Sequence, residues 1–103
     1  MTYSPNWKDK NTDLLVRALL HLKNEEDAYR LLEDLCTISE IKAMAQRMEV
    51  ASLLAGDVTY NTIASQTGAS TATISRVKRC LNYGADGYRR VLAGMNEEAD
   101  HVE

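Results

Sequence analysis

Apolar residues recur at helical spacing along most of the chain, and polar or turn-forming residues separate the apolar segments. A repeat of about 3.6 residues is typical of helices that bury one face. The chain has a single Pro and few clusters of Val or Ile, which argues against an extended sheet. The pattern therefore predicts an all-α protein, and a length of 103 residues predicts a single domain over residues 1–103.

The first predicted helix begins at Asn11 or Thr12, either of which can cap it, and runs to about Leu22. Its apolar residues cover most of the helix circumference; they are Leu14, Leu15, Val16, Ala18, Leu19, Leu20 and Leu22. A helix of this kind must be buried on more than one side. A small chain achieves that more easily with a second copy, so we interpret this segment as a dimerisation helix.

Two further helices follow, each with its own capping signal. Asn24 caps a helix over 25–35, whose first turn is acidic and so complements the helix dipole. Thr37 and Glu40 form a capping box that opens a long helix ending near Ala55. The predicted buried residues are Ala28, Leu31, Leu32 and Leu35 in the first helix, and Ile41, Met44, Ala45, Met48, Ala51 and Leu54 or Ala55 in the second.

The stretch from Thr59 to Leu81 predicts two short helices joined by a tight turn. Thr59 caps the first helix, Gly68 ends it in a left-handed conformation, and Ser70 caps the second. The apolar anchors have the spacing of a helix-turn-helix; they are Ile63, Ala64, Ile74 and Val77. A helical hairpin without a nucleic-acid function is the alternative interpretation of the same pattern.

The outer face of the second of these helices carries the candidate DNA contacts. Small side chains let a helix enter a major groove, and hydroxyl groups and Arg bind base edges or phosphates. Base reading is predicted for Thr71, Ala72, Thr73, Ser75 and Arg76. Phosphate binding is predicted for Lys78, Arg79, Arg89 and Arg90, and for backbone N–H groups at Ser70 and Thr71.

The two ends of the chain carry weaker patterns. The first nine residues are polar and predicted to be loose, with Tyr3 and Trp7 available for packing. Residues 82–87 contain two Gly and an Asp and are predicted to form a loop. A short final helix is expected around Tyr88, and the polar segment from Asn96 to Glu103 is expected to fray.

Charge is distributed unevenly along the chain. The net charge is −3, yet residues 60–90 contain five basic residues and one acidic residue, a local balance of +4 that leaves −7 for the remainder. A basic patch on an acidic body is typical of a DNA-binding surface at one end of a scaffold, although a chance fluctuation would give the same count.

Catalytic, metal-binding and membrane signals are missing from the sequence. The two histidines, His21 and His101, belong to no catalytic constellation, so we expect neither an enzyme nor a metal or cofactor. Cys36 and Cys80 lack metal-ligand and redox spacing, which with no apparent signal peptide predicts reduced thiols in the cytoplasm. No run reaches the roughly 18 apolar residues of a membrane span.

Four segments carry a resemblance to a known family: TISE at 37–40, AQRMEV at 45–50, GASTATISR at 68–76 and LNYGADGY at 81–88. With them the chain resembles the Trp-repressor superfamily, and more closely its Trp-repressor-like proteins of the YerC/YecD type. The resemblance implies about six helices in an intertwined homodimer. It also implies two helix-turn-helix units that enter successive major grooves of double-stranded DNA.

The resemblance further implies a possible ligand site, because the family holds tryptophan between two arginines. Arg76 matches one of them and Arg47 resembles the other. The family has Gly after the recognition-helix arginine, whereas this chain has Val77, which would crowd an indole. Cys80 replaces a hydroxyl residue three positions later. We therefore expect no response to tryptophan. Whether an unknown effector binds stays open. Without a bound ligand, Arg76 would be free to contact DNA or an acidic neighbour.

Together these observations predict a sequence-specific, DNA-binding transcriptional regulator that acts as a homodimer. The alternative is a helical protein-interaction module that binds no DNA and uses the acidic body as its working surface.

Overall fold

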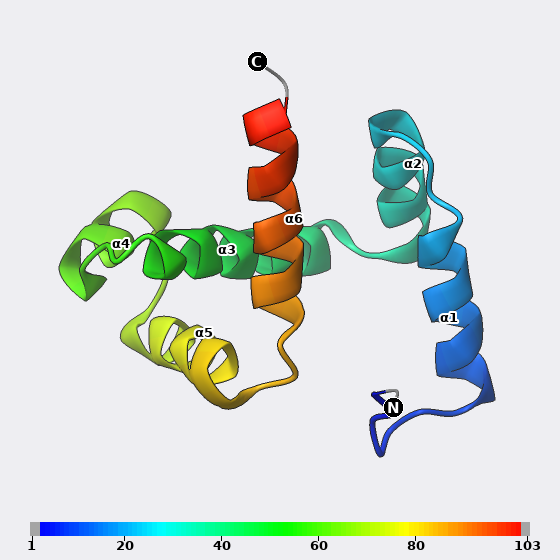
Figure 1. Cartoon of the computed structure of the whole chain (residues 1–103), viewed down its shortest axis with the longest axis horizontal. Coiled ribbons are helices and arrows are strands. Elements are labelled where there is room, and N and C mark those ends of the chain that lie inside the picture. Colours follow the sequence, from blue (N-terminus) through cyan, green and yellow to red (C-terminus); the bar gives the residue numbers. More distant parts are fainter. Residues whose placement is uncertain (1–2, 102–103) are drawn as a thin grey trace. The chain divides into compact units, whose positions relative to one another are not determined.

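The computed structural model describes residues 3–101, and six α-helices and no strand lie in this range (Figure 1). The helices are α1 (Lys10–Leu20), α2 (Glu25–Leu35), α3 (Ile38–Ala55), α4 (Tyr60–Thr67), α5 (Thr71–Tyr83) and α6 (Gly87–His101). The predicted all-α class is therefore confirmed. The chain divides into two compact units, Met1–Thr37 and Ile38–Glu103. Whether they form the single predicted domain stays a prediction.

Helix α1 begins with a capping box, and the residue predicted to cap it was wrong. The N-cap of α1 is Asp9, not Asn11 or Thr12: the Asp9 carboxylate accepts the Thr12 N–H at 2.8 Å, and the Thr12 hydroxyl accepts the Asp9 N–H at 2.8 Å. The bond from the Thr12 N–H lowers the pKa of the Asp9 carboxyl. Because the folded pKa is lowered, the cap stabilises the helix above the ordinary aspartate pKa, and this is lost as the pH falls through the lowered value.

Neither helix of the first unit buries a residue within its own chain. Asn24 caps α2 as predicted, accepting the Asp27 N–H at 2.8 Å. Leu14 is 60% exposed and Leu20 77% exposed on α1, and Leu35 is 52% exposed on α2. The apolar faces that the sequence predicted to be buried are thus not fully buried in a single chain. Helix α1 also ends two residues earlier than predicted, at Leu20.

The second unit contains the core. Helix α3 contacts α4, α5 and α6, and α6 crosses it in Figure 1. The buried residues are Val50, Ala51, Ile63, Ala69, Ile74, Val77 and Leu81. The inward positions predicted on α5 are confirmed. Val50 was missed and Ala45 is exposed, because three helices pack on α3 and a single stripe of apolar residues does not describe its buried surface.

The boundaries of α5 and α6 also differ from the predictions. Helix α5 continues two residues further, to Tyr83, where the Gly84 N–H donates to the Cys80 carbonyl at 2.9 Å. A Cβ at Gly84 would lie 2.5 Å from that carbonyl oxygen, so the close approach requires glycine. The fraying expected from Asn96 onward is wrong as far as His101, since residues 95–101 contain neither Gly nor Pro and α6 continues through them. Residues 102–103 lie outside the described range.

Candidate nucleic-acid interface

The turn between α4 and α5 has the local geometry that the sequence predicted. The Thr59 hydroxyl accepts the Thr62 N–H at 3.3 Å, and the Ser70 hydroxyl accepts the Thr73 N–H at 3.1 Å. Gly68 adopts a left-handed φ of 72°, and its N–H donates to the Ala64 carbonyl at 3.0 Å. Because both caps and the turn are made locally, the start of α5 is fixed relative to α4.

Because Gly68 has a left-handed conformation, two substitutions at this position should lower the free energy of unfolding by different amounts. Gly68→Ala should lower the free energy of unfolding by about 1 kcal/mol, because a Cβ is disfavoured at this φ. Gly68→Asn should lower it less, since Asn tolerates the left-handed region. No side chain or backbone atom lies within 4 Å of a Cβ at this position, so the comparison isolates backbone strain. Urea unfolding of the three proteins at equal concentration measures the difference, and equal stability of all three would contradict it.

The outer face of α5 brings together four of the predicted contact residues. Ala72, Ser75, Arg76 and Arg79 line one surface hollow of about 250 Å³, and all four are exposed. Behind them Ile74 and Val77 are only 1% exposed, so the helix separates a core face from a solvent face. Thr71 is exposed, whereas Thr73 is half-buried and its hydroxyl accepts a hydrogen bond from the Ser70 hydroxyl at 3.1 Å. Small, hydroxyl and cationic groups therefore share one accessible surface.

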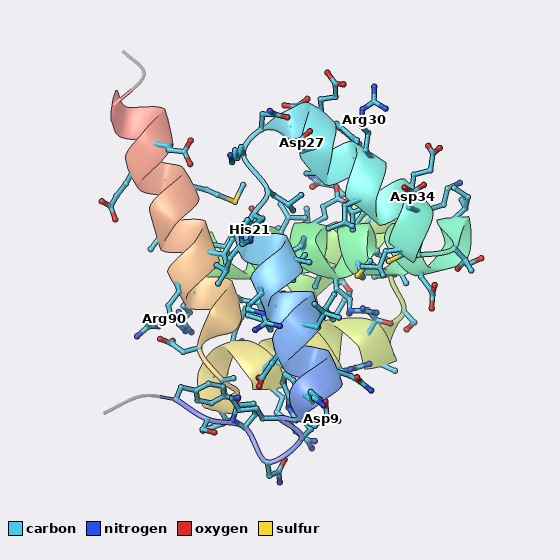
Figure 2. All side chains as sticks on the ribbon, turned by 90° about the vertical axis from the view of Figure 1, so that its right-hand side faces the viewer. Asp9, His21, Asp27, Arg30, Asp34 and Arg90 are labelled. Atoms are coloured by element: carbon cyan, nitrogen blue, oxygen red, sulfur yellow. The ribbon has the colours of Figure 1, made fainter. Side chains whose placement is uncertain are left out.

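The predicted cations are not equivalent in the structure. In the described part of the chain, Arg76 and Arg79 make no hydrogen bond or ion pair. Lys78 lies 5.6 Å from the centre of the Tyr60 ring on α4, a cation–π distance. Arg90 approaches the Asp86 carboxylate at 3.4 Å in an exposed pair and points away from α6 (Figure 2).

Arg89 has the closest contacts of these cations. Its Nε donates to the Leu81 carbonyl at 2.7 Å, and its guanidinium donates to the Asn82 side-chain oxygen at 3.3 Å. Neither Asn82, which was predicted to lie in a loop, nor Tyr60 was predicted to contact a cation of the site. Tyr60 follows the cap of α4 and Asn82 lies in the last turn of α5, but only the folded chain places them beside a cation.

The two arginines of the possible ligand site lie on different helices, and the hollow that Arg76 lines does not include Arg47. Arg47 is half-buried on α3, Arg76 is exposed on α5, and no hydrogen bond or ion pair involving either is found among residues 3–101. Val77 belongs to the core. Cys80 lines a separate apolar cavity of about 400 Å³ between α3, α5 and α6; the other lining residues are Met48, Ala85, Gly87, Tyr88 and Val91.

The segment from residue 3 to residue 101 contains no cluster of three or more His, Cys, Asp or Glu side chains arranged to hold a metal ion. None of its helices is long and apolar enough to span a membrane. Cys36 and Cys80 are both free thiols.

Comparison with known proteins gives one consistent family. The family model described as Trp repressor protein matches residues 10–96. The uncharacterized protein YerC of Bacillus subtilis (strain 168) is 53% identical over 90 residues, which is 87% of this chain and 86% of YerC.

Two solved structures are similar over nearly the whole chain. A TrpR-like protein from Eubacterium eligens ATCC 27750 has a TM-score of 0.83 at 52% identity, over 86% of this chain and 92% of that one. A candidate Trp repressor from Staphylococcus aureus has a TM-score of 0.84 at 46% identity, over 87% and 90% of the two chains. Sequence and structure agree, and the chain belongs to the Trp-repressor family.

Proposed function

We propose that the protein is a sequence-specific, DNA-binding transcriptional regulator of the cytoplasm that acts as a homodimer through its helix-turn-helix. The observation that carries the proposal is the outer face of α5. There Arg76 and Arg79, unpaired in the described chain, line a hollow together with Ala72 and Ser75. The opposite face of the same helix packs in the core. A rigid helix with small side chains and free guanidinium groups fits a DNA major groove.

Base reading in this proposal depends on short side chains. Thr71, Ala72 and Ser75 are exposed, and none reaches far beyond the helix surface. Arg76 is the long side chain that can pair with guanine. Because few direct base contacts are available, we expect water-mediated contacts and DNA shape to supply part of the specificity.

The exposed leucines of α1 and α2 support the homodimer. A single chain leaves no residue of either helix buried, and Leu14, Leu20 and Leu35 are each more than half exposed. Large exposed apolar surfaces mark interaction sites. A second copy with the same helices would cover them and would present two helix-turn-helix units to one DNA duplex.

A lack of response to tryptophan is part of the proposal. The Val77 side chain is 1% exposed and fills core volume next to Arg76, where glycine would leave space. Saturating L-tryptophan should therefore leave the DNA affinity unchanged within error, measured by fluorescence anisotropy on a selected DNA fragment. A shift of the binding curve by about tenfold or more, equivalent to about 1.4 kcal/mol, would show that an indole site exists despite Val77.

Selection from a pool of random genomic fragments tests the proposed function. The dimer should enrich particular fragments repeatedly, and binding to them should weaken steeply with salt, because phosphate contacts release counterions. A folded dimer that enriches no fragment even at low salt would contradict the proposal. That result would favour the protein-interaction module, for which the acidic face of α2, with Asp27 and Asp34 pointing outward in Figure 2, is the available surface.

A further inference from the structure

The Arg89 side chain on α6 forms hydrogen bonds with the C-terminal end of α5, the proposed recognition helix. Its Nε donates to the Leu81 carbonyl at 2.7 Å, and its guanidinium donates to the Asn82 side-chain oxygen at 3.3 Å. Arg89 lies in the first turn of α6, so these bonds join two helices across the short loop between them. The shorter bond, to Leu81, is partly buried.

One of the two atoms that Arg89 contacts, the Leu81 carbonyl oxygen, is a backbone group that needs a partner at the end of a helix. The last four carbonyls of an α-helix have no intrahelical donor. In α5 the Cys80 carbonyl accepts the Gly84 N–H at 2.9 Å, and the next carbonyl, that of Leu81, accepts the Arg89 Nε–H. A cation at this end also interacts favourably with the helix dipole.

The surroundings of Arg89 are less suited to a phosphate than those of Arg76 or Arg79. Arg89 lines a polar hollow of about 160 Å³ that also includes Lys78 and Asp57, so a carboxylate there offsets one of the two cations. A bidentate phosphate contact through Nε would leave the Leu81 carbonyl without its donor, at an energetic penalty. Arg76 and Arg79 have no contact of this kind to give up in the described chain.

We propose that Arg89 is a positioning residue, which holds the C-terminal end of α5 on α6 and does not itself bind a DNA phosphate. This inference rests on the proposed DNA binding, because it states how the recognition helix is kept in place. It replaces the sequence-based expectation that Arg89 binds phosphate, and it leaves Arg76 and Arg79 as the free guanidinium groups on α5.

The test compares Arg89→Met with Arg79→Met, because both remove a guanidinium and keep an apolar stem. Arg89→Met should reduce affinity for a selected fragment by about tenfold without changing the slope of log affinity against log salt. Arg79→Met should make that slope shallower by about 0.9 for each phosphate that the protein no longer neutralises. The neutral change Asn82→Ala should weaken DNA binding in the same direction as Arg89→Met. Combined with Arg89→Met it should weaken binding by less than the product of the two single effects.

Hydrogen exchange supplies a readout that does not involve DNA. Amides in the last turn of α5, including the Gly84 N–H, should exchange faster in Arg89→Met than in the wild type, and should be unchanged in Arg90→Met and Arg79→Met. A shallower salt slope with wild-type exchange in Arg89→Met would overturn the inference and make Arg89 a phosphate-binding residue. If the wild-type protein binds no DNA, the proposed function fails. The exchange data then decide alone whether Arg89 holds the end of α5 in place. Unchanged exchange in Arg89→Met would overturn the inference.

Discussion

We expect Arg79→Glu to lower affinity for a selected DNA fragment by on the order of 100-fold, with the fold and the oligomeric state unchanged. Arg79 is exposed on the outer face of α5 and has no hydrogen-bond or ion-pair partner in residues 3–101, so its replacement disturbs no internal contact. A charge-assisted bond to phosphate contributes roughly 1.5–3 kcal/mol, and the new carboxylate adds repulsion. A factor of about 100 corresponds to about 2.8 kcal/mol.

Arg30→Glu is the matched control for this prediction. It makes the same change in net charge on α2, where Arg30 is 74% exposed and pairs with Glu26 at 2.8 Å (Figure 2). Fluorescence anisotropy at one salt concentration compares the two variants, and analytical ultracentrifugation checks the dimer. Equal reductions of affinity in both variants would indicate a general charge effect, and wild-type affinity in Arg79→Glu would place the DNA surface elsewhere.

The second large expected effect is a loss of folding stability when a core residue of α5 is truncated. Ile74→Ala should lower the free energy of unfolding by about 3 kcal/mol, within the usual range of roughly 2–5 kcal/mol for such a truncation in a core. Ile74 is 1% exposed and is one of only seven buried residues in the described chain, so few neighbours can close the resulting cavity. The decrease is a large fraction of the stability of a small domain.

Ser75→Ala, at the next residue along α5, is the control for Ile74→Ala. Ser75 is exposed, so its truncation should change the free energy of unfolding by about 0.5 kcal/mol or less. Urea unfolding of both variants at the same protomer concentration makes the comparison, because dimer stability depends on concentration. A decrease below about 1 kcal/mol for Ile74→Ala would mean that the buried face of α5 does not anchor it.

Local signals in the sequence predicted the helix-turn-helix well. The Thr59 and Ser70 caps, the left-handed Gly68 and the inward positions Ile74 and Val77 all depend on residues within a few positions of one another. The cap of α1 was missed although it is equally local. Asp9, Asn11 and Thr12 are all capping residue types, and the sequence does not say which of them adopts the extended conformation.

Features that depend on packing between helices could not be predicted. Val50 lies off the stripe chosen on α3, and it is buried because α4, α5 and α6 pack against that helix from different sides. The hydrogen bonds of Arg89 could not be predicted for the same reason. As a sequence position Arg89 is one of several cations near the proposed recognition helix, and only the approach of α6 to the end of α5 gives it the Leu81 carbonyl as a partner.

Mapping of amide chemical shifts by NMR, with the protein bound to a selected DNA fragment, shows whether the outer face of α5 binds DNA. The largest changes are expected at residues 70–76 and at Arg79, with small changes along the exposed acidic face of α2. Changes concentrated on α2, with α5 unaffected at saturating DNA, would contradict the claim that the outer face of α5 binds DNA.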